Sequence, residues 1–263
     1  SWSDIMKKLY ILSTGAGGTE YITTQALDAL DECEVVVSYT KYAKELKELI
    51  GEKELYTSGM THEIDRCQQA IEFAKGGKTT CIISNGDVNV FGMATLIVEL
   101  VDEQNLWEEI EVISIAGVTS FLATASSVGA PVSQDFAVIS LSDRLTDINM
   151  IDKRVKNALD ADFIIGIYNP KSKTRTQPYL NFLDALNECD EKIAIIASNV
   201  GREKESINIT TTTDLITQGL EHPDVSMSTL IMICNSNTRL TSNGKVLTPR
   251  GYLKKYEMDG SIK

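Results

Sequence analysis

Short runs of aliphatic and β-branched residues alternate with amphipathic stretches along most of the chain. The runs in the first half are KLYILST, CEVVVSY, TTCIISN and EVISIAG, and those in the second half include DFIIGIYN and KIAIIASN. Between them, segments such as residues 63–75 and 93–101 repeat apolar residues at three- and four-residue spacing, which is typical of helices. The alternation predicts an α/β fold in which helices cover parallel strands.

The pattern changes after Gly129-Ala130-Pro131, where the strand-like run FAVISLS is followed by a polar stretch. We therefore predict an N-terminal α/β domain over residues 8–130 and a C-terminal α/β domain over residues 131–256. The last third has threonine-rich strands and turns, at residues 207–212, 228–234 and 244–252. These favour antiparallel pairing, so the second sheet is expected to be mixed and the first mainly parallel.

Composition narrows the classes of function. The chain has 263 residues with 25 basic and 37 acidic side chains, a net charge of −12, which disfavours binding to nucleic acid or to acidic membranes. An anionic substrate would need a local basic pocket. The five cysteines are scattered without CxxC spacing, so no metal site or disulfide framework is expected. No apolar run approaches the ~20 residues of a membrane span, and we expect a cytoplasmic protein.

Two glycine-rich turns follow predicted strands. The first, STGAGG at residues 13–18, lacks the third glycine of a dinucleotide-binding motif, and a plain strand-to-helix connection explains it equally well. The second, SNGDVNVFG at residues 84–92, contains Gly86, where backbone amides can approach a ligand closely. Asp87 can accept hydrogen bonds from a ligand or cap the turn, and the residues alone favour capping.

The order of four motifs adds a family resemblance to this pattern. GAGGTEYIT, GDVNVFG, AGVTS and NVGRE follow one another as in the S-adenosylmethionine-dependent tetrapyrrole (corrin and porphyrin) methyltransferases, which the chain resembles from about Lys8 to Tyr256. Further stretches resemble the branch that methylates C17 of precorrin-3B or cobalt-factor III, namely SYTKYAKEL, GAPVSQDFAVISLSDRLTD, FIIGIYNPKSKTR and TLIMICNSNTRLTSNGKVLTPRGY.

The resemblance implies two α/β domains with an active-site trough between them, the tetrapyrrole methylase fold. It also implies S-adenosylmethionine as cofactor, an anionic tetrapyrrole as substrate and a homodimer, with no nucleic-acid or membrane partner. The implied reaction belongs to cobalamin biosynthesis: a methyl group is transferred to C17 and the ring contracts, giving precorrin-4 or cobalt-precorrin-4.

Position in the family motifs also implies residue roles. The residues expected to bind the cofactor are Gly15, Gly86, Asp87, Val90, Phe91, Thr119, Ser120, Tyr168, Asn169, Val200, Gly201, Arg202 and Thr229. Those expected to bind substrate carboxylates are the cations Lys41, Arg144, Lys171 and Arg175. Each cation is also consistent with a solvated surface charge, and Thr119-Ser120 with a simple helix cap.

Ring contraction requires proton transfer, for which Asp87, Ser142 and Asp143 are the candidate catalytic residues. Gln134 stands where the branch usually has a histidine, and neither His62 nor His222 is expected to be catalytic.

The cofactor loop departs from the family in one respect, because Val88-Asn89 replaces proline-glycine. Proline presets φ and glycine tolerates positive φ, so the usual pair stabilises a tight bend. We expect Asn89 to retain the turn in a left-handed conformation, in a less preorganised loop with weaker cofactor affinity.

Three alternatives remain open at this point. The chain can be another corrin-ring methyltransferase, a non-catalytic corrinoid-binding carrier, or a protein-modifying enzyme of the diphthine synthase kind. The position of a newly added methyl group separates the first, and calorimetry with the demethylated cofactor separates the second.

Overall fold

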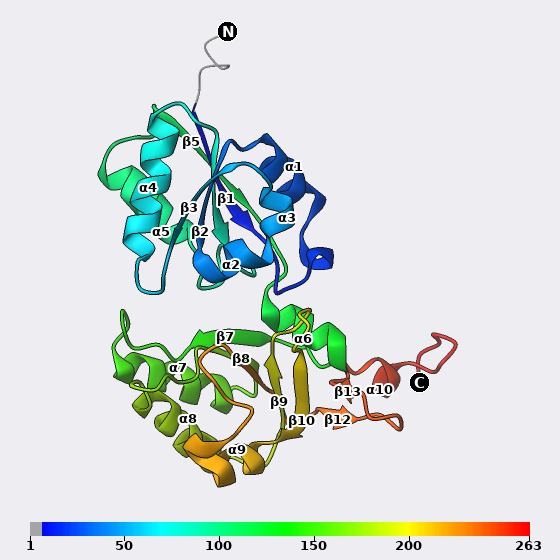
Figure 1. Ribbon diagram of the computed structural model, residues 1–263. Coiled ribbons are helices and arrows are strands. Elements are labelled where there is room, and N and C mark those ends of the chain that lie inside the picture. The colour runs from blue at the N-terminus through cyan, green and yellow to red at the C-terminus, as the bar shows by residue number, and fades with distance from the viewer. Residues whose placement is uncertain (1–6) are drawn as a thin grey trace. The chain divides into compact units, whose positions relative to one another are not determined.

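The computed structural model describes residues 7–263, and the chain divides into two compact units, Ser1–Ser120 and Phe121–Lys263. Each unit is an α/β structure with its own sheet (Figure 1). The division falls earlier than the predicted boundary after Ala130. Helix α6 (Ser120–Val128) accounts for the difference, because its side chains Phe121, Ala125 and Val128 lie in an apolar core of the second unit.

The first unit has one parallel sheet with the strand order β3-β2-β4-β1-β5. Its strands are β1 (Lys7–Ser13), β2 (Val35–Tyr39), β3 (Glu54–Ser58), β4 (Thr80–Ser84) and β5 (Ile110–Ile115). Its helices are η2 (Thr19–Tyr21), α1 (Thr24–Glu32), α2 (Thr40–Glu45), α3 (Lys47–Ile50), α4 (Glu63–Lys75) and α5 (Ala94–Glu103). The parallel sheet predicted from the alternating pattern is confirmed.

The interior strand β1 shows why the runs are apolar throughout. Leu9 and Ile11 pack in one core with residues of α4 and α5, whereas Tyr10 and Leu12 pack in a second core with residues of α1, α2 and α3. Successive side chains of a strand point to opposite faces, so helices on both faces require apolar residues at every position. The apolar spacing of α4 is likewise explained, because its buried residues face the sheet.

The second unit has a mixed sheet with the order β10-β9-β11-β8-β7, in which only β7 and β8 are parallel. Its strands are β7 (Phe136–Ser140), β8 (Ile164–Tyr168), β9 (Ile193–Ser198), β10 (Ser206–Thr211) and β11 (Leu230–Ile233). Its other helices are α7 (Ile148–Asp160), α8 (Gln177–Asn187), α9 (Thr212–Gln218), η3 (Gly219–Glu221) and α10 (Tyr252–Lys255). The predicted mixed character of this sheet is confirmed.

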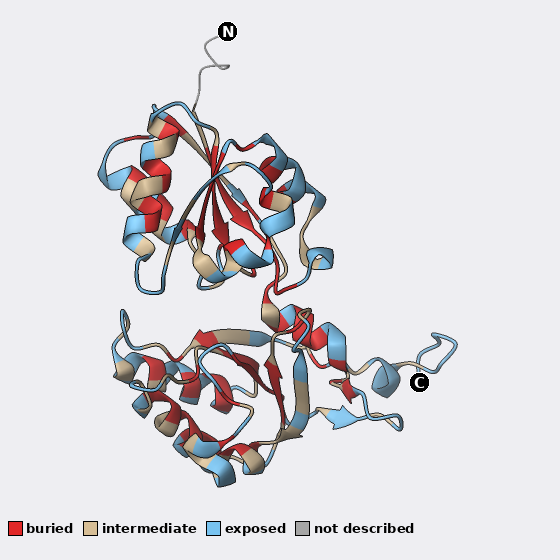
Figure 2. Cartoon of the chain, viewed as in Figure 1, coloured by how far each residue is buried: buried red, intermediate tan, exposed pale blue. Residues whose placement is uncertain are grey.

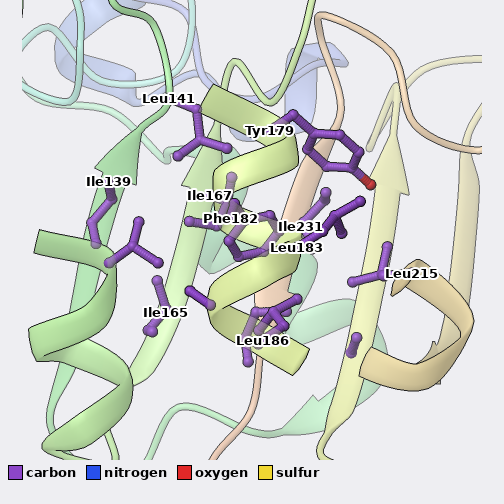
Figure 3. Close-up of a cluster of buried hydrophobic side chains, with 14 of the residues drawn as sticks. Ile139, Leu141, Ile165, Ile167, Tyr179, Phe182, Leu183, Leu186, Leu215 and Ile231 are labelled. Atoms are coloured by element: carbon purple, nitrogen blue, oxygen red, sulfur yellow. The ribbon is translucent and has the colours of Figure 1, made fainter. Parts of the chain in front are cut away.

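One face of the second sheet is covered by α7, α8 and α9, whose inner sides are buried (Figure 2). Figure 3 shows the core there: Tyr179 and Phe182 of α8 lie over Ile165, Ile167 and Ile231 of the sheet. A smaller sheet joins β6 (Gly129–Ala130), β13 (Val246–Leu247) and β12 (Arg239–Leu240).

Within residues 7–263, no helix combines the length and the apolar character needed to cross a membrane. The same residues contain no group of His, Cys, Asp and Glu side chains that could hold a metal ion.

Candidate active site

The glycine-rich loops after β1 and β4 are joined backbone to backbone at the carboxyl edge of the first sheet. The Gly15 N–H donates to the Gly86 carbonyl at 3.1 Å, and the Gly86 N–H donates back to the Gly15 carbonyl at 2.8 Å. Beside this pair, the Thr14 N–H donates to the Ser84 carbonyl at 3.1 Å. The two glycine-rich turns identified in the sequence are therefore joined to each other by backbone hydrogen bonds.

Asp87 connects the loop after β5 to these two turns. Its Oδ2 accepts a hydrogen bond from the Gly117 N–H at 2.9 Å, and its Oδ1 accepts one from the Asn89 N–H at 2.7 Å. Both carboxylate oxygens therefore hold backbone, as the capping interpretation expects. A catalytic role for Asp87 stays a prediction. We call the three loops, residues 14–18, 85–92 and 116–119, the loop clasp.

Close contacts explain two of the glycines of the loop clasp. A Cβ on Gly117 would lie 2.4 Å from Ser13 Cβ and 2.5 Å from the Gly86 carbonyl oxygen. A Cβ on Gly15, whose φ is 79°, would lie 2.6 Å from Tyr21 Cβ. These distances are shorter than van der Waals contact, so any side chain at either position would push the loops apart.

Gly86 is different, because a Cβ there would make ordinary van der Waals contacts rather than a clash. Its φ is 69°, and a Cβ would meet only Thr119, at 3.7 Å from Cα and 3.9 Å from Oγ1. The left-handed backbone, rather than a close contact, therefore explains the glycine at this position. Binding of S-adenosylmethionine beside Gly86 and Thr119 stays a prediction.

The Val88-Asn89 departure is accommodated differently from the prediction. The left-handed non-glycine residue of the loop is Phe91, with φ 53° and 53% of its surface exposed, and the expectation for Asn89 is wrong. Val88 is 1% exposed in the core, and its N–H donates to Ser13 Oγ at 2.9 Å. Because Asp87 already fixes Asn89, the turn needs neither proline nor glycine. The lower cofactor affinity stays a prediction.

In the second unit, Ser140 holds two candidate residues where β7 and β8 end. Its Oγ accepts hydrogen bonds from Asn169 Nδ2 at 3.0 Å and from the Ser142 N–H at 3.2 Å. Next to it, the Tyr168 hydroxyl accepts from the Phe121 N–H at 3.1 Å, which caps the start of α6. Asn169 is left-handed, with φ 50°, as asparagine tolerates.

Three charged candidates lie near the end of β7: Asp143 and Arg144 directly follow Ser142, and Arg175 contacts Leu141. Arg175 Nη1 donates to the Leu141 carbonyl at 2.9 Å, and the side chain is half-buried. Burial lowers the pKa of Arg175, nearby Arg144 lowers it further, and Asp143 opposes both effects. Arg144 and Asp143 are exposed. The structure thus brings Asp143, Arg144 and Arg175 near one another, and their role in substrate binding stays a prediction.

Lys171 does not join this group. Its Nζ donates to the Leu220 carbonyl at 2.7 Å, so the ammonium is held against the 3₁₀ helix η3. Lys41 is exposed in the first turn of α2, in the first unit.

Four of the residues expected to bind the cofactor lie in or against the loop after β9, namely Val200, Gly201, Arg202 and Thr229. The Gly201 N–H donates to Glu205 Oε1 at 3.0 Å, and the Arg202 N–H donates to the Asn199 carbonyl at 2.9 Å. Val200 is buried there. Thr229 anchors the same loop, because its Oγ1 lies 3.0 Å from Ser198 Oγ.

The serines that end the strands were not among the predicted site residues. Ser84 Oγ accepts from the Met93 N–H at 3.2 Å, and the hydroxyls of Ser13, Ser140 and Ser198 hold loops as described. The signal was present, because each apolar run ends in serine: KLYILS, TTCIIS, FAVIS and IAIIAS.

The family model of the tetrapyrrole (corrin/porphyrin) methylases matches residues 8–216, well over half of the chain. The chain belongs to this family. A relative from Methanocaldococcus jannaschii, named a probable cobalt-factor III C(17)-methyltransferase, is 37% identical over 254 residues, which is 95% of this chain and 100% of the relative. A Salmonella typhimurium protein of the same name is 38% identical and covers 93% of this chain and 99% of its own.

Solved structures agree with this membership. The crystal structure of the methyltransferase CobJ matches with a TM-score of 0.83 at 28% identity, covering 92% of this chain and 99% of CobJ. The cobalt precorrin-4 methyltransferase CbiF shares the fold, with a TM-score of 0.64 at 20% identity over 87% of this chain and 95% of CbiF. The predicted family and fold are confirmed.

Proposed function

We propose that the protein transfers a methyl group from S-adenosylmethionine to C17 of precorrin-3B or cobalt-factor III, with ring contraction, in cobalamin biosynthesis. The observation that carries the proposal is the loop clasp, which joins three loops around Gly86 and Asp87 at the carboxyl edge of the first sheet, in a chain whose full-length relatives are named for this reaction. The products would be precorrin-4 or cobalt-precorrin-4.

The loop clasp would serve by holding the donor in place. When bound, the cofactor supplies an electrophilic methyl group on its sulfonium. Methyl transfer by in-line displacement needs no nucleophilic side chain, so the task of the protein is to fix the geometry and exclude water. Asp87, Ser13 and Ser84 fix the loop backbone through four hydrogen bonds. The proposed cofactor contacts are Gly15, Gly86, Val90, Phe91, Thr119 and Ser120 in the first unit, and Tyr168, Asn169, Val200, Gly201, Arg202 and Thr229 in the second.

The substrate would be held by charge. It is a polycarboxylate, and the net charge of −12 repels it, so a few placed cations must supply the attraction. Arg175 and Arg144 are the proposed ligands of one carboxylate, while Lys41 and Lys171 are weaker proposals given their positions. Ser142 and Asp143 beside them are proposed for the proton transfers of ring contraction.

The decisive experiment is incubation of the purified protein with S-adenosylmethionine and either cobalt-factor III or precorrin-3B. Mass spectrometry should find the gain of one methyl group, and NMR should place it at C17 of a contracted ring. A methyl group on another carbon would instead identify another corrin-ring methyltransferase. No calorimetric binding of S-adenosylhomocysteine would favour a corrinoid carrier. Light scattering tests the homodimer expected of the family.

A further inference from the structure

Arg66 is a buried cation that the proposed function does not use. It lies in the first turn of α4 and is 6% exposed. Its Nη1 donates to the Gly59 carbonyl at 2.7 Å and to Ser58 Oγ at 3.1 Å, and its Cζ lies 5.7 Å from the centroid of the Tyr39 ring. Arginine is almost never this buried unless its charge is paired.

No acidic residue of the described chain forms an ion pair with Arg66. Asp65, in the same turn, contacts His62 instead, with 3.4 Å between Oδ2 and Nδ1, and its side chain is largely exposed. Glu63 is half-buried and makes no ion pair. A buried charge without a counter-charge is costly, so the protein retains here a group that an anion would stabilise.

Part of the guanidinium is still able to bind. A guanidinium has five N–H donors, and Nη1 is the nitrogen that contacts Ser58 and Gly59. Nε and Nη2 donate no hydrogen bond to another described residue. Neither is one of the fully buried side-chain atoms without a partner, so both keep some contact with solvent. These two nitrogens form an edge that pairs with the two oxygens of a carboxylate. The contacts at Nη1 and the Tyr39 ring fix the orientation of that edge, which lowers the entropy lost on binding.

The position of Arg66 relates it to the loop clasp. β3 ends at Ser58, and α4 begins soon after it, at the carboxyl edge where the loop clasp also lies. In the sheet order, one strand, β2, separates β3 from β4, so the two sites are about 10 Å apart at the usual strand spacing. The other cations of the segments around this edge include Lys41 and Lys44, and both are exposed.

We propose that Arg66 binds a carboxylate of the tetrapyrrole substrate through Nε and Nη2. The inference rests on the proposed function and extends it, because it gives the first unit a rigid substrate ligand. A carboxylate of the cofactor is the other possible source, but the cofactor seat proposed at Gly86 lies two strands away. Binding of the macrocycle by its edge would leave its reacting carbon free to face the donor.

The test compares Arg66→Lys, Arg66→Met and Lys44→Met in steady-state methylation of cobalt-factor III. Arg66→Lys keeps the charge and most of the stem but loses the planar fork. Lys44→Met removes one charge from an exposed side chain of the same region and is the matched control. Loss of a hydrogen-bonded charge should raise the KM for the tetrapyrrole about 10- to 100-fold. The kcat, the affinity for S-adenosylhomocysteine and the control should remain within about twofold of the parent.

The outcomes separate this proposal from the proposed function. Turnover by the parent protein with an unchanged KM in both Arg66 variants overturns the role of Arg66 alone. Weaker binding of S-adenosylhomocysteine in parallel with the KM also overturns it, since Arg66 then acts on the cofactor site. A parent protein without turnover or tetrapyrrole binding overturns both proposals.

Crystals of the parent protein soaked with cobalt-factor III give a readout that needs no variant. Carboxylate oxygens should lie about 2.7–2.9 Å from Nε and Nη2 of Arg66. A bound tetrapyrrole with no carboxylate at that edge overturns the proposal even if the Arg66 variants fail to fold.

Discussion

Replacement of Gly117 by alanine tests whether close backbone contact holds the loop clasp together. The added Cβ would lie 2.4 Å from Ser13 Cβ and 2.5 Å from the Gly86 carbonyl oxygen, and neither atom belongs to a flexible side-chain end. Gly117 has no left-handed φ, so the substitution adds bulk without backbone strain. The loops after β1 and β5 must therefore separate.

The magnitude follows from this geometry. Overpacking of a tight contact costs about 1–3 kcal/mol, which corresponds to a fall in Tm of about 4–12 °C for a unit of this size. Separation also lengthens the hydrogen bond from the Gly117 N–H to Asp87 Oδ2, now 2.9 Å. Because that bond fixes the loop at Gly86, affinity for S-adenosylhomocysteine should fall at least about tenfold, which is about 1.4 kcal/mol.

The assay is thermal unfolding with and without S-adenosylhomocysteine, together with calorimetric titration of the same ligand. Gly59→Ala is the matched control, since a Cβ there meets nothing within 4 Å and the φ is not left-handed. A Gly117→Ala protein with the parent Tm and the parent affinity would refute the reasoning, because it would mean that the loops can part at no cost. A lower Tm with unchanged affinity would separate loop packing from cofactor binding.

Three further predictions concern single side chains. Asp87→Asn should weaken S-adenosylhomocysteine binding about tenfold, because one charge-assisted hydrogen bond is lost. The kcat at saturating cofactor should be retained, and a fall in kcat of more than about 100-fold would instead support catalysis by Asp87. Tyr179→Phe should raise the free energy of unfolding in urea by about 1 kcal/mol, because the buried Tyr179 hydroxyl has no hydrogen-bond partner among the described residues. A destabilised variant would show that the hydroxyl is bonded. Hydrogen bonds from His222, Gln218 and Thr210 lower the pKa of Asp214 below its ordinary value of 3.8, so its carboxylate stabilises the fold above about pH 4, and this stabilisation is lost as the pH falls through the lowered pKa. The Tm difference between the parent and Asp214→Asn should therefore shrink on acidification below about pH 4, and a constant difference would contradict this.

The sequence predicted the elements where local pattern decides structure. Apolar runs such as those of β1 and β4 are buried on both faces of a parallel sheet, so their composition alone identified them. Family motifs identified the Gly86-Asp87 loop and the Asn169 and Gly201 turns, where left-handed backbone restricts the residue type.

What the sequence could not give depends on contacts between distant residues. The predicted conformation of Asn89 was wrong because burial of Val88 and its hydrogen bond to the distant Ser13, rather than the intrinsic preference of each residue, hold the turn together with Asp87. The division between the two units falls before the predicted boundary for a similar reason. Nothing local shows that the apolar face of α6, with Phe121, packs on the second sheet, where Gly166 leaves space for it.

The late position of β11 in the chain bears on how the protein is made. The first sheet has all its strands once β5 has left the ribosome, so the first unit can fold while the rest is still being translated. The second sheet cannot close in the same way, because β11, at Leu230–Ile233, inserts between β8 and β9. Until it arrives, the facing edges of β8 and β9 expose apolar strands with free backbone groups, which pair readily with other chains. Nascent chains of intermediate length should therefore be the ones that depend most on chaperones.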